Sequence, residues 1–381
     1  MDQSERARAW AGTMRGGGDA EGIVVAHRSA PPPRVGPARV GREDREERET
    51  ATLAAGATPA VGAGNRVAPE APDPHRTCFE RDRDRILHAA AFRRLAGKTQ
   101  VFVFPADHQR TRLTHALEVA QVATAVARAA GLNVALTEAI ALGHDCGHGP
   151  GGHASEDAFD PFLPQGYDHA VWGADVVLTS LNLCAQTLDG IRNHSWSRPT
   201  PATPEGVVVS WADRCAYSAH DLEDAVTAGI VDPGDLPPTV TEVAGASRSS
   251  QLRSFIGALI DCIADHGAVG MDPDHAEALA ALRSFNYDRI YTRPASVAQA
   301  DSVIAVLRAL VEHFASHPDQ IPSSPLRRLP TTGRGAVGTD ARAADPLRDA
   351  ITYVGGMTDR YAFETAVTLL DWPRHRLPHA V

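Results

Sequence analysis

The sequence predicts a mainly α-helical protein, and three observations support this fold class. Apolar residues recur at helical spacing through most of the chain from residue 78 onward. Glycine, asparagine and proline stand where these periodic segments begin and end, as at helix termini. The β-rich piece at 99–104, TQVFVF, is short and isolated. We therefore expect nearly all ordered parts of the chain to be helical.

The composition is typical of a globular protein without a membrane segment. Of the 381 residues, 43% are hydrophobic and 22% are charged, and the apolar runs fall short of the roughly 18 residues that span a bilayer. Five scattered cysteines form no CxxC pair, which argues against a disulfide scaffold and a cysteine zinc site. The N-terminus lacks the apolar run of a secretory signal. These features predict a cytoplasmic protein.

A net charge of −10 argues against a general nucleic-acid-binding protein. Residues 1–75 mix proline, glycine, alanine and charge, with few large apolar side chains. This composition cannot build a core and predicts a disordered N-terminal extension. Such an extension could be a regulatory tail or a dispensable segment.

The first predicted helices follow in order from residue 79. The first runs from about 79 to Gly97, and the second, over 110–131, ends at the C-capping Gly131. Asn133 can cap a third helix over 134–145, and glycines at 147 and 149 end it. Further helices are predicted at 168–192, 206–229, 249–266, 274–285, 296–315 and 346–371, with a long loop at 317–345.

Histidines and acids concentrate in the glycine-rich stretch 141–157, ALGHDCGHGPGGHASED. His144 and Asp145 stand side by side at a predicted helix end, where both can face one ion. His115 lies in the preceding helix, and the short connection predicts that these two helices are antiparallel neighbours. This arrangement predicts a metal-centred hydrolytic site.

A fourth ligand is expected from a later helix. The segment SWADRCAYSAHDLEDA offers Asp213, Tyr217, Asp221 and Asp224 at i, i+4, i+8 and i+11, along one helical stripe. Acids and a tyrosine on one stripe indicate a helix face that lines a polar cavity. Spacing alone leaves open which acid reaches the ion.

Several sequence blocks, in this order, resemble the bacterial deoxyguanosine triphosphate triphosphohydrolase family of HD-domain metal phosphohydrolases. They are RDRDRILHAAAFRRLAGKTQVF, RTRLTHALEVAQVATAVARAAGLN, LTEAIALGHDCGHGPGGHASED, GYDHA, NHS, WADRCAYSAHDLEDA and GGMTDRYA. The resemblance implies an all-α HD-domain fold with a C-terminal helical extension. It places one enzyme domain over 76–381, with an HD core at about 110–230 and a C-terminal part at about 245–381.

The resemblance implies that the metal ligands are His115, His144, Asp145 and Asp213. Two imidazoles and two carboxylates suit a divalent ion such as Mn²⁺, Mg²⁺, Fe²⁺ or Co²⁺. The implied reaction splits a deoxynucleoside triphosphate into deoxynucleoside and intact triphosphate.

The family's catalytic pair corresponds to His153 and Glu156, and His169 matches another histidine near the phosphates. Because a leaving 5′-oxygen needs a proton, His148, His153 and His169 are all candidates for the proton donor. The spacing of His153 and Glu156 lets the acid orient the imidazole if a helix begins there.

For the substrate, the resemblance implies a phosphate contact from Arg112, with Arg214, Arg93 and Lys98 as weaker candidates. It implies that deoxyribose is read by Gln100, Tyr217 and Asp221, with a further nucleotide contact from Tyr291.

The resemblance further implies a homo-oligomer and activation by a dNTP at a second site. Two other functions stay open at this stage. One is an HD phosphohydrolase that acts on another nucleotide phosphoester, and the other is a catalytically weak sensor that binds dNTP or single-stranded nucleic acid. The pair Tyr217 and Asp221 favours deoxynucleotides, and the full ligand set favours hydrolysis.

Overall fold

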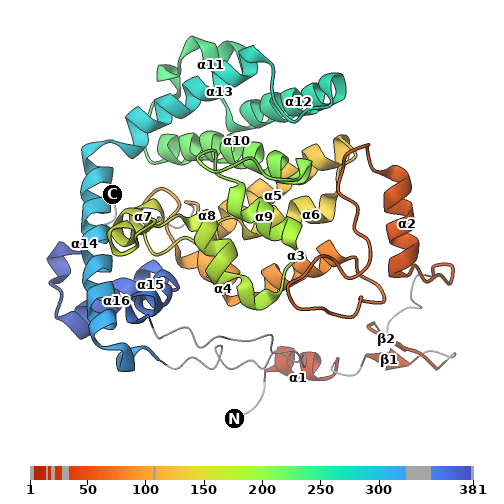
Figure 1. Cartoon of the computed structure of the whole chain (residues 1–381), viewed down its shortest axis with the longest axis horizontal. Coiled ribbons are helices and arrows are strands. Elements are labelled where there is room, and N and C mark those ends of the chain that lie inside the picture. Colours follow the sequence, from red (N-terminus) through yellow and green to blue (C-terminus); the bar gives the residue numbers. More distant parts are fainter. Residues whose placement is uncertain are drawn as a thin grey trace. The chain divides into compact units, whose positions relative to one another are not determined.

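The computed structural model describes residues 4–13, 16–18, 22–27, 34–105, 109–322 and 345–378. They belong to two units, Met1–Val40 and Gly41–Val381. The smaller unit contains helix α1 (Glu5–Ala11), none of whose residues is buried, and the two-residue antiparallel strands β1 (Gly17–Gly18) and β2 (Val24–Val25). In the larger unit every regular element among the described residues is helical (Figure 1), which confirms the predicted fold class.

Residues 41–75 belong to the larger unit, which differs from the expected disordered extension through residue 75. Helix α2 (Arg42–Thr52) begins this segment, and its Glu49 accepts hydrogen bonds from the Ala60 amide and the Asn133 side chain. The Arg66 side chain is 1% exposed and pairs with buried Asp82. The segment holds its place through polar contacts and one buried alanine rather than large apolar side chains, so its composition gives no signal of order.

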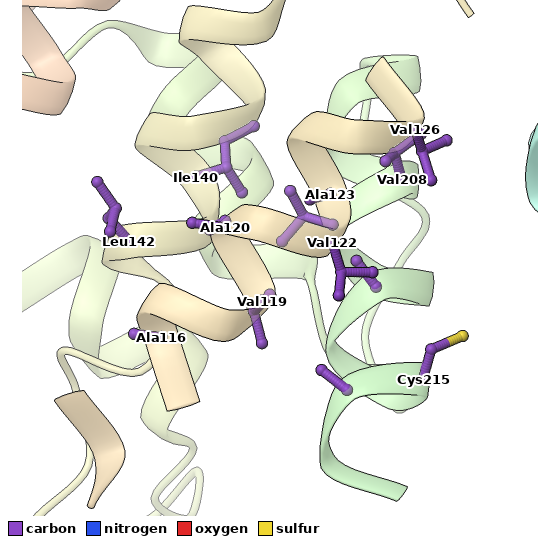
Figure 2. Close-up of a cluster of buried hydrophobic side chains, with 14 of the residues drawn as sticks. Ala116, Val119, Ala120, Val122, Ala123, Val126, Ile140, Leu142, Val208 and Cys215 are labelled. Atoms are coloured by element: carbon purple, nitrogen blue, oxygen red, sulfur yellow. The ribbon is translucent and has the colours of Figure 1, made fainter. Parts of the chain in front are cut away.

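The core that supports the site lies between α5 (Arg112–Ala129), α6 (Val134–Gly143) and α10 (Pro204–Thr227). Valines and alanines on α5 meet Ile140 of α6 and Val208 of α10 (Figure 2). The Asn133 side chain accepts a hydrogen bond from the Leu136 amide, which confirms the predicted cap of α6. Because small residues pack closely between them, α5, α6 and α10 lie near one another. Their polar ends therefore come together.

Three predicted helices are interrupted. The first consists of α3 (Cys78–His88) and α4 (Ala90–Arg94), because Ala89 adopts an extended conformation. The segment 168–192 contains α8 (His169–Trp172), a π-helical turn at Gly173–Val177 and α9 (Ala185–Asn193). The segment 346–371 divides into α15 (Pro346–Gly355) and α16 (Asp359–Leu370). The residues of 99–104 form no strand, and Thr99 makes only an isolated bridge with Thr111.

The remaining helices flank the central three (Figure 1). On one side lie α11 (Pro238–Val243), α12 (Arg248–His266) and α13 (Pro273–Asn286). On another, α14 (Pro294–Ser316) packs with α7 (His153–Phe159), α15 and α16 around a second apolar cluster. Of the predicted loop at 317–345, residues 323–344 lie outside the described residues.

Helix α14 has the length and apolar composition of a membrane span. Its Val303, Val306 and Leu307 are nevertheless fully buried in the second apolar cluster. Of its most apolar 18-residue window, 33% is buried, so these contacts account for part of its apolar composition. Elsewhere among the residues that the structure describes, no helix meets the same test.

Candidate metal centre and substrate cavity

The structure brings together the four side chains predicted as metal ligands. His115 projects from α5, His144 and Asp145 follow α6, and Asp213 projects from α10. Asp213 Oδ1 lies 3.0 Å from His115 Nε2 and 3.6 Å from His144 Nε2. Asp145 Oδ1 lies 3.4 Å from His144 Nε2. His115, His144 and Asp145 therefore form one ion-sized group, and Asp213 joins His144 in a second group that overlaps it.

The orientation of His144 suits a cation ligand. Its Nδ1 lies 2.6 Å from the carbonyl oxygen of Ala141 and donates to it, which leaves the lone pair on Nε2. That Nε2 atom is buried, has no hydrogen-bond partner and faces two carboxylates. Burial opposes a charge on this ring, but Asp145 and Asp213 still raise the pKa of His144 to about 9. The site thus attracts positive charge at the position that a divalent cation would occupy, and the residues fit such an ion.

Arg112 lies beside this cluster and places a positive charge next to it. Its side chain is 2% exposed, and Nη1 donates to Asp145 Oδ2 at 2.7 Å. Although burial works against ionisation of Asp145, Arg112 and the neighbouring histidines hold its pKa well below the usual range. The Nε and Nη2 atoms of Arg112 are buried without hydrogen-bond partners, and the residue lines a cavity. Unused guanidinium donors in a cavity fit an anionic ligand such as a phosphate.

Glu156 links two histidines next to the cluster. Helix α7 begins at His153, so Glu156 lies one turn further along it. Glu156 Oε1 is 2.8 Å from His153 Nδ1 and 3.0 Å from His169 Nδ1. The predicted orientation of His153 by Glu156 is therefore present in the structure.

The three histidines that could carry a proton have different surroundings. Burial and Arg112 hold the pKa of His148 well below its usual range, so this ring is neutral near pH 7. Burial also opposes a charge on His169, but Glu156 raises its pKa. The His153 side chain is 75% exposed and lines the cavity. These surroundings favour His153 and His169 over His148 as proton donors.

Sequence reasoning gave no role to His194, which the structure places at the centre of the site. This buried ring donates from Nδ1 to the Ile191 carbonyl at 2.8 Å, and its Nε2 lies 3.2 Å from His169 Nε2. Its Nε2 side also approaches His144 and Asp213 closely enough to share an ion. Burial and the adjacent His144 lower the pKa of His194 to about 3. The only sequence signal was the short block NHS.

A cavity of about 450 Å³ extends from the metal-ligand cluster along α10. At its other end, Tyr291 OH donates to Asp221 Oδ2 at 2.6 Å, and Arg283 Nε donates to Tyr217 OH at 2.9 Å. Burial raises the pKa of Asp221 to about 7, and its Oδ1 atom lacks a hydrogen-bond partner. Gln100 also lines the cavity, and its Oε1 is buried without a hydrogen-bond partner. Polar groups with spare hydrogen-bonding capacity thus stand at both ends of the cavity.

The weaker phosphate candidates occupy different positions. Arg214 lines the cavity, and its guanidinium carbon lies 3.4 Å from the centre of the Trp196 ring. Lys98 is 3% exposed and does not line the cavity, because its Nζ donates to the carbonyls of His148 and Gly355. Arg93 is exposed outside the cavity lining. Arg214 alone of these three is placed to meet a ligand in the cavity.

Comparisons with known proteins show the family to which the chain belongs. The HD domain family matches residues 112–218, and the phosphohydrolase-associated domain family matches residues 269–367. A deoxyguanosinetriphosphate triphosphohydrolase-like protein of Caldanaerobacter subterraneus subsp. tengcongensis is 37% identical over 84% of this chain and 93% of its own. Proteins of the same description from Clostridium perfringens (38% identical, 77% of this chain and 86% of the relative) and Desulfatibacillum aliphaticivorans (34%, 84% and 95%) are also similar.

Proposed function

Because the chain belongs to the family of deoxyguanosinetriphosphate triphosphohydrolase-like proteins with an HD domain, we propose that it hydrolyses deoxynucleoside triphosphates. The products would be deoxynucleoside and inorganic triphosphate. The observation that carries this proposal is a single cavity that joins the cluster around His144, the free edge of Arg112 and the pair Asp221 and Tyr291. In this proposal the end near Arg112 takes the phosphates and the end near Asp221 and Tyr291 takes the sugar.

The reaction forms a bond from a water oxygen to the α-phosphorus and breaks the bond from that phosphorus to the 5′-oxygen. In the proposed assignment, His115, His144, Asp145 and Asp213 hold a divalent cation. When bound, such a cation supplies charge neutralisation and lowers the pKa of water. Arg112 holds the phosphate through its free Nε and Nη2. The 5′-oxygen leaves with a proton from the histidine pair that Glu156 orients.

At the sugar end, the proposal assigns recognition of deoxyribose to Gln100, Tyr217 and Asp221. Asp221 Oδ1 and Gln100 Oε1 are free acceptors that can bind the 3′-hydroxyl. The proposal places the Tyr217 ring, whose hydroxyl accepts a hydrogen bond from Arg283, beside the sugar, where it would exclude a 2′-hydroxyl. The proposed substrate class is therefore deoxy- rather than ribonucleotides.

The proposal is tested by incubating the purified full chain with each dNTP and each rNTP in Mn²⁺ or Mg²⁺. We expect deoxynucleoside and triphosphate from dNTPs and little product from rNTPs. Release of orthophosphate or pyrophosphate, or hydrolysis only of monophosphates, would indicate another HD phosphohydrolase activity. Tight dNTP or single-strand binding without any product would indicate a sensor.

The composition-based prediction of a cytoplasmic protein stays a prediction, as do the resemblance-based predictions of a homo-oligomer and of activation by a second dNTP. Sedimentation of the chain with and without dNTP tests assembly, and we expect a species larger than a monomer. The dependence of the hydrolysis rate on dNTP concentration tests activation, and we expect the rate to rise more than in proportion to concentration.

Replacement of His153 should separate proton transfer from metal binding. We expect His153→Ala to keep its metal content and to lose about two to four orders of magnitude in kcat, the usual range for general acid–base groups. The reason is that His153 contacts Glu156 and lies outside the cluster of His115, His144 and Asp145; it belongs to a separate ion-sized group with His148, Glu156 and His169, so metal content is the deciding readout. Metal analysis and steady-state kinetics check this. A metal-free variant would identify His153 as a ligand.

Replacement of Trp196 should weaken binding of the triphosphate through Arg214. The indole covers one face of the guanidinium and leaves its N–H edges free for an anion. Loss of a cation–π contact of about 0.5–2 kcal/mol corresponds to a rise in KM of about 2- to 30-fold. We expect Trp196→Leu to show this rise, and to add little in an Arg214→Ala background. Full additivity of the two substitutions would contradict the coupling.

A further inference from the structure

The carboxylate of Asp359 connects two walls of the cavity from a helix outside the HD domain match. Asp359 is the first residue of α16 and is 5% exposed. Its Oδ2 accepts hydrogen bonds from the Thr99 amide at 2.9 Å and the Thr99 hydroxyl at 2.5 Å. Its Oδ1 accepts one from the Gly151 amide at 2.8 Å. Both partners, Thr99 and Gly151, line the cavity.

The two walls carry different parts of the proposed chemistry. Thr99 immediately precedes Gln100, which stands at the sugar end. Gly151 lies two residues before His153, which contacts Glu156. One buried side chain therefore bonds both to the segment that precedes Gln100 and to the loop that leads to His153.

Neighbouring contacts fasten the same loop to the C-terminal helices. Lys98 Nζ donates to the His148 carbonyl and, at 2.9 Å, to the Gly355 carbonyl at the end of α15. Gly151 has φ +73°, and a Cβ at this position would lie 2.4 Å from Val303 Cγ1 of α14. The loop thus rests directly on α14, α15 and α16.

We propose that Asp359 is a positioning residue that fixes the segment 99–100 and the loop 147–153 relative to each other. This inference rests on the proposed function for its kinetic consequences, but its structural part does not. Three donors converge on the carboxylate, which can only accept. An amide of the same shape would turn its NH₂ toward one of these donors, so the link between the two walls would be broken and both segments would gain freedom.

The chain provides a matched control in Glu205. This carboxylate is fully buried and accepts hydrogen bonds from the Thr58 amide at 3.0 Å, the Thr58 hydroxyl at 2.7 Å and the Asn133 amide at 3.0 Å. The pattern of a threonine amide, its hydroxyl and one distant amide is the same as at Asp359. None of these three residues lines the cavity. Glu205→Gln therefore removes a similar set of bonds without touching the proposed site.

The structural part is tested by hydrogen–deuterium exchange of the full chain without substrate. We expect Asp359→Asn to accelerate exchange in peptides that cover both 98–103 and 147–153. We expect Glu205→Gln to accelerate it around 57–60 and 132–134 instead. If Asp359→Asn leaves either cavity segment at its original exchange rate, the connection is refuted, whatever the protein's activity.

The functional part is tested by kinetics well below the melting temperature of each variant. We expect Asp359→Asn to lower kcat about tenfold or more and to reduce the preference for deoxy- over ribonucleotides, with metal content unchanged. Glu205→Gln should keep the kcat of the original chain and its preference for deoxy- over ribonucleotides. If Asp359→Asn folds and keeps both the kcat of the original chain and its preference for deoxy- over ribonucleotides, the positioning role is overturned.

If Asp359→Asn does not fold, Thr99→Val and Thr58→Val replace the pair, because each removes only the hydroxyl bond. Thr99→Val should then lower kcat, and Thr58→Val should not. Equal kcat in these two variants would also overturn the proposal. If the original chain hydrolyses no dNTP, the proposed function fails, while the exchange experiment still decides whether Asp359 couples the walls.

Discussion

Asp213→Asn is expected to lose bound metal and all hydrolytic activity. Asp213 Oδ1 lies 3.0 Å from His115 Nε2 and 3.6 Å from His144 Nε2, so it faces both imidazoles of the cluster. Although burial opposes its ionisation, these histidines hold the pKa of Asp213 well below the usual range. The carboxylate is thus charged at any working pH, and an amide would remove a negative charge where a divalent cation must bind.

Asp221→Asn is the informative partner of this variant, because Asp221 repeats the His-Asp pairing in HDLED. Eight residues of α10 separate the two acids, a rise of about 12 Å. Asp221 bonds to Tyr291 and belongs to none of the ion-sized clusters found among the described residues. We expect Asp221→Asn to keep its metal, to bind dNTPs more weakly and to lose much less affinity for 2′,3′-dideoxynucleotides.

Metal analysis of the two purified variants, followed by hydrolysis assays, decides between the acids. Retained secondary structure in both variants is the necessary control. A metal-loaded Asp213→Asn together with a metal-free Asp221→Asn would reverse the assignment of the fourth ligand.

Removal of the first 73 residues should abolish stable folding, whereas removal of the first 40 should not. The cut at residue 74 deletes Arg66, whose Nη1 lies 2.6 Å from Asp82 Oδ1. Both side chains are at most 1% exposed. Removing one partner of a buried ion pair costs about 3–5 kcal/mol. The free energy of unfolding of a domain is about 5–15 kcal/mol. Loss of the ion pair, together with loss of the hydrogen bonds of Glu49 and Thr58, therefore removes a large part of it.

Thermal unfolding of the chains 41–381 and 74–381 checks this expectation. Arg66→Ala in the full chain should reproduce part of the destabilisation, and exposed Arg39→Ala should leave the melting temperature unchanged. For residues 1–40, a separate unit, we propose that dNTP turnover does not need them. Equal melting temperatures for the two truncated chains would refute the structural role of residues 41–73.

Local patterns in the sequence were sufficient for several parts of the protein. Capping and periodicity predicted α5, α6, α10, α12, α13 and α14, with ends close to those observed. The adjacency of His144 and Asp145 and the stripe through Asp213 and Asp221 follow from helical geometry, so they could be read from spacing. The family resemblance then selected His115 and Asp213 as partners of the pair.

Other features depend on contacts between distant segments, which no local pattern records. His194 is a buried ring after α9, and only the packing of α9 against α6 and α8 brings it to His144 and His169. Residues 41–75 carry few large apolar side chains, and their order depends on bonds to Asp82, Asn133 and Glu205. The break at Ala89 has no glycine or proline to mark it, whereas the break after Gly355 falls at Gly356 and at Thr358, whose side chain caps α16.

Asp359 shows most clearly the difference between what local sequence predicts and what contacts between distant segments decide. In the sequence it is one acid in the block GGMTDRYA, more than 200 residues from the glycine-rich stretch. The tertiary structure puts its carboxylate on the amides of Thr99 and Gly151. The sequence by itself determined most of the helices and the adjacency of His144 and Asp145, because these depend on local spacing, while the choice of His115 and Asp213 came from the family resemblance. Only the tertiary structure decided which buried groups hold those helices and loops in register, because burial and hydrogen-bond partners are set by the whole fold.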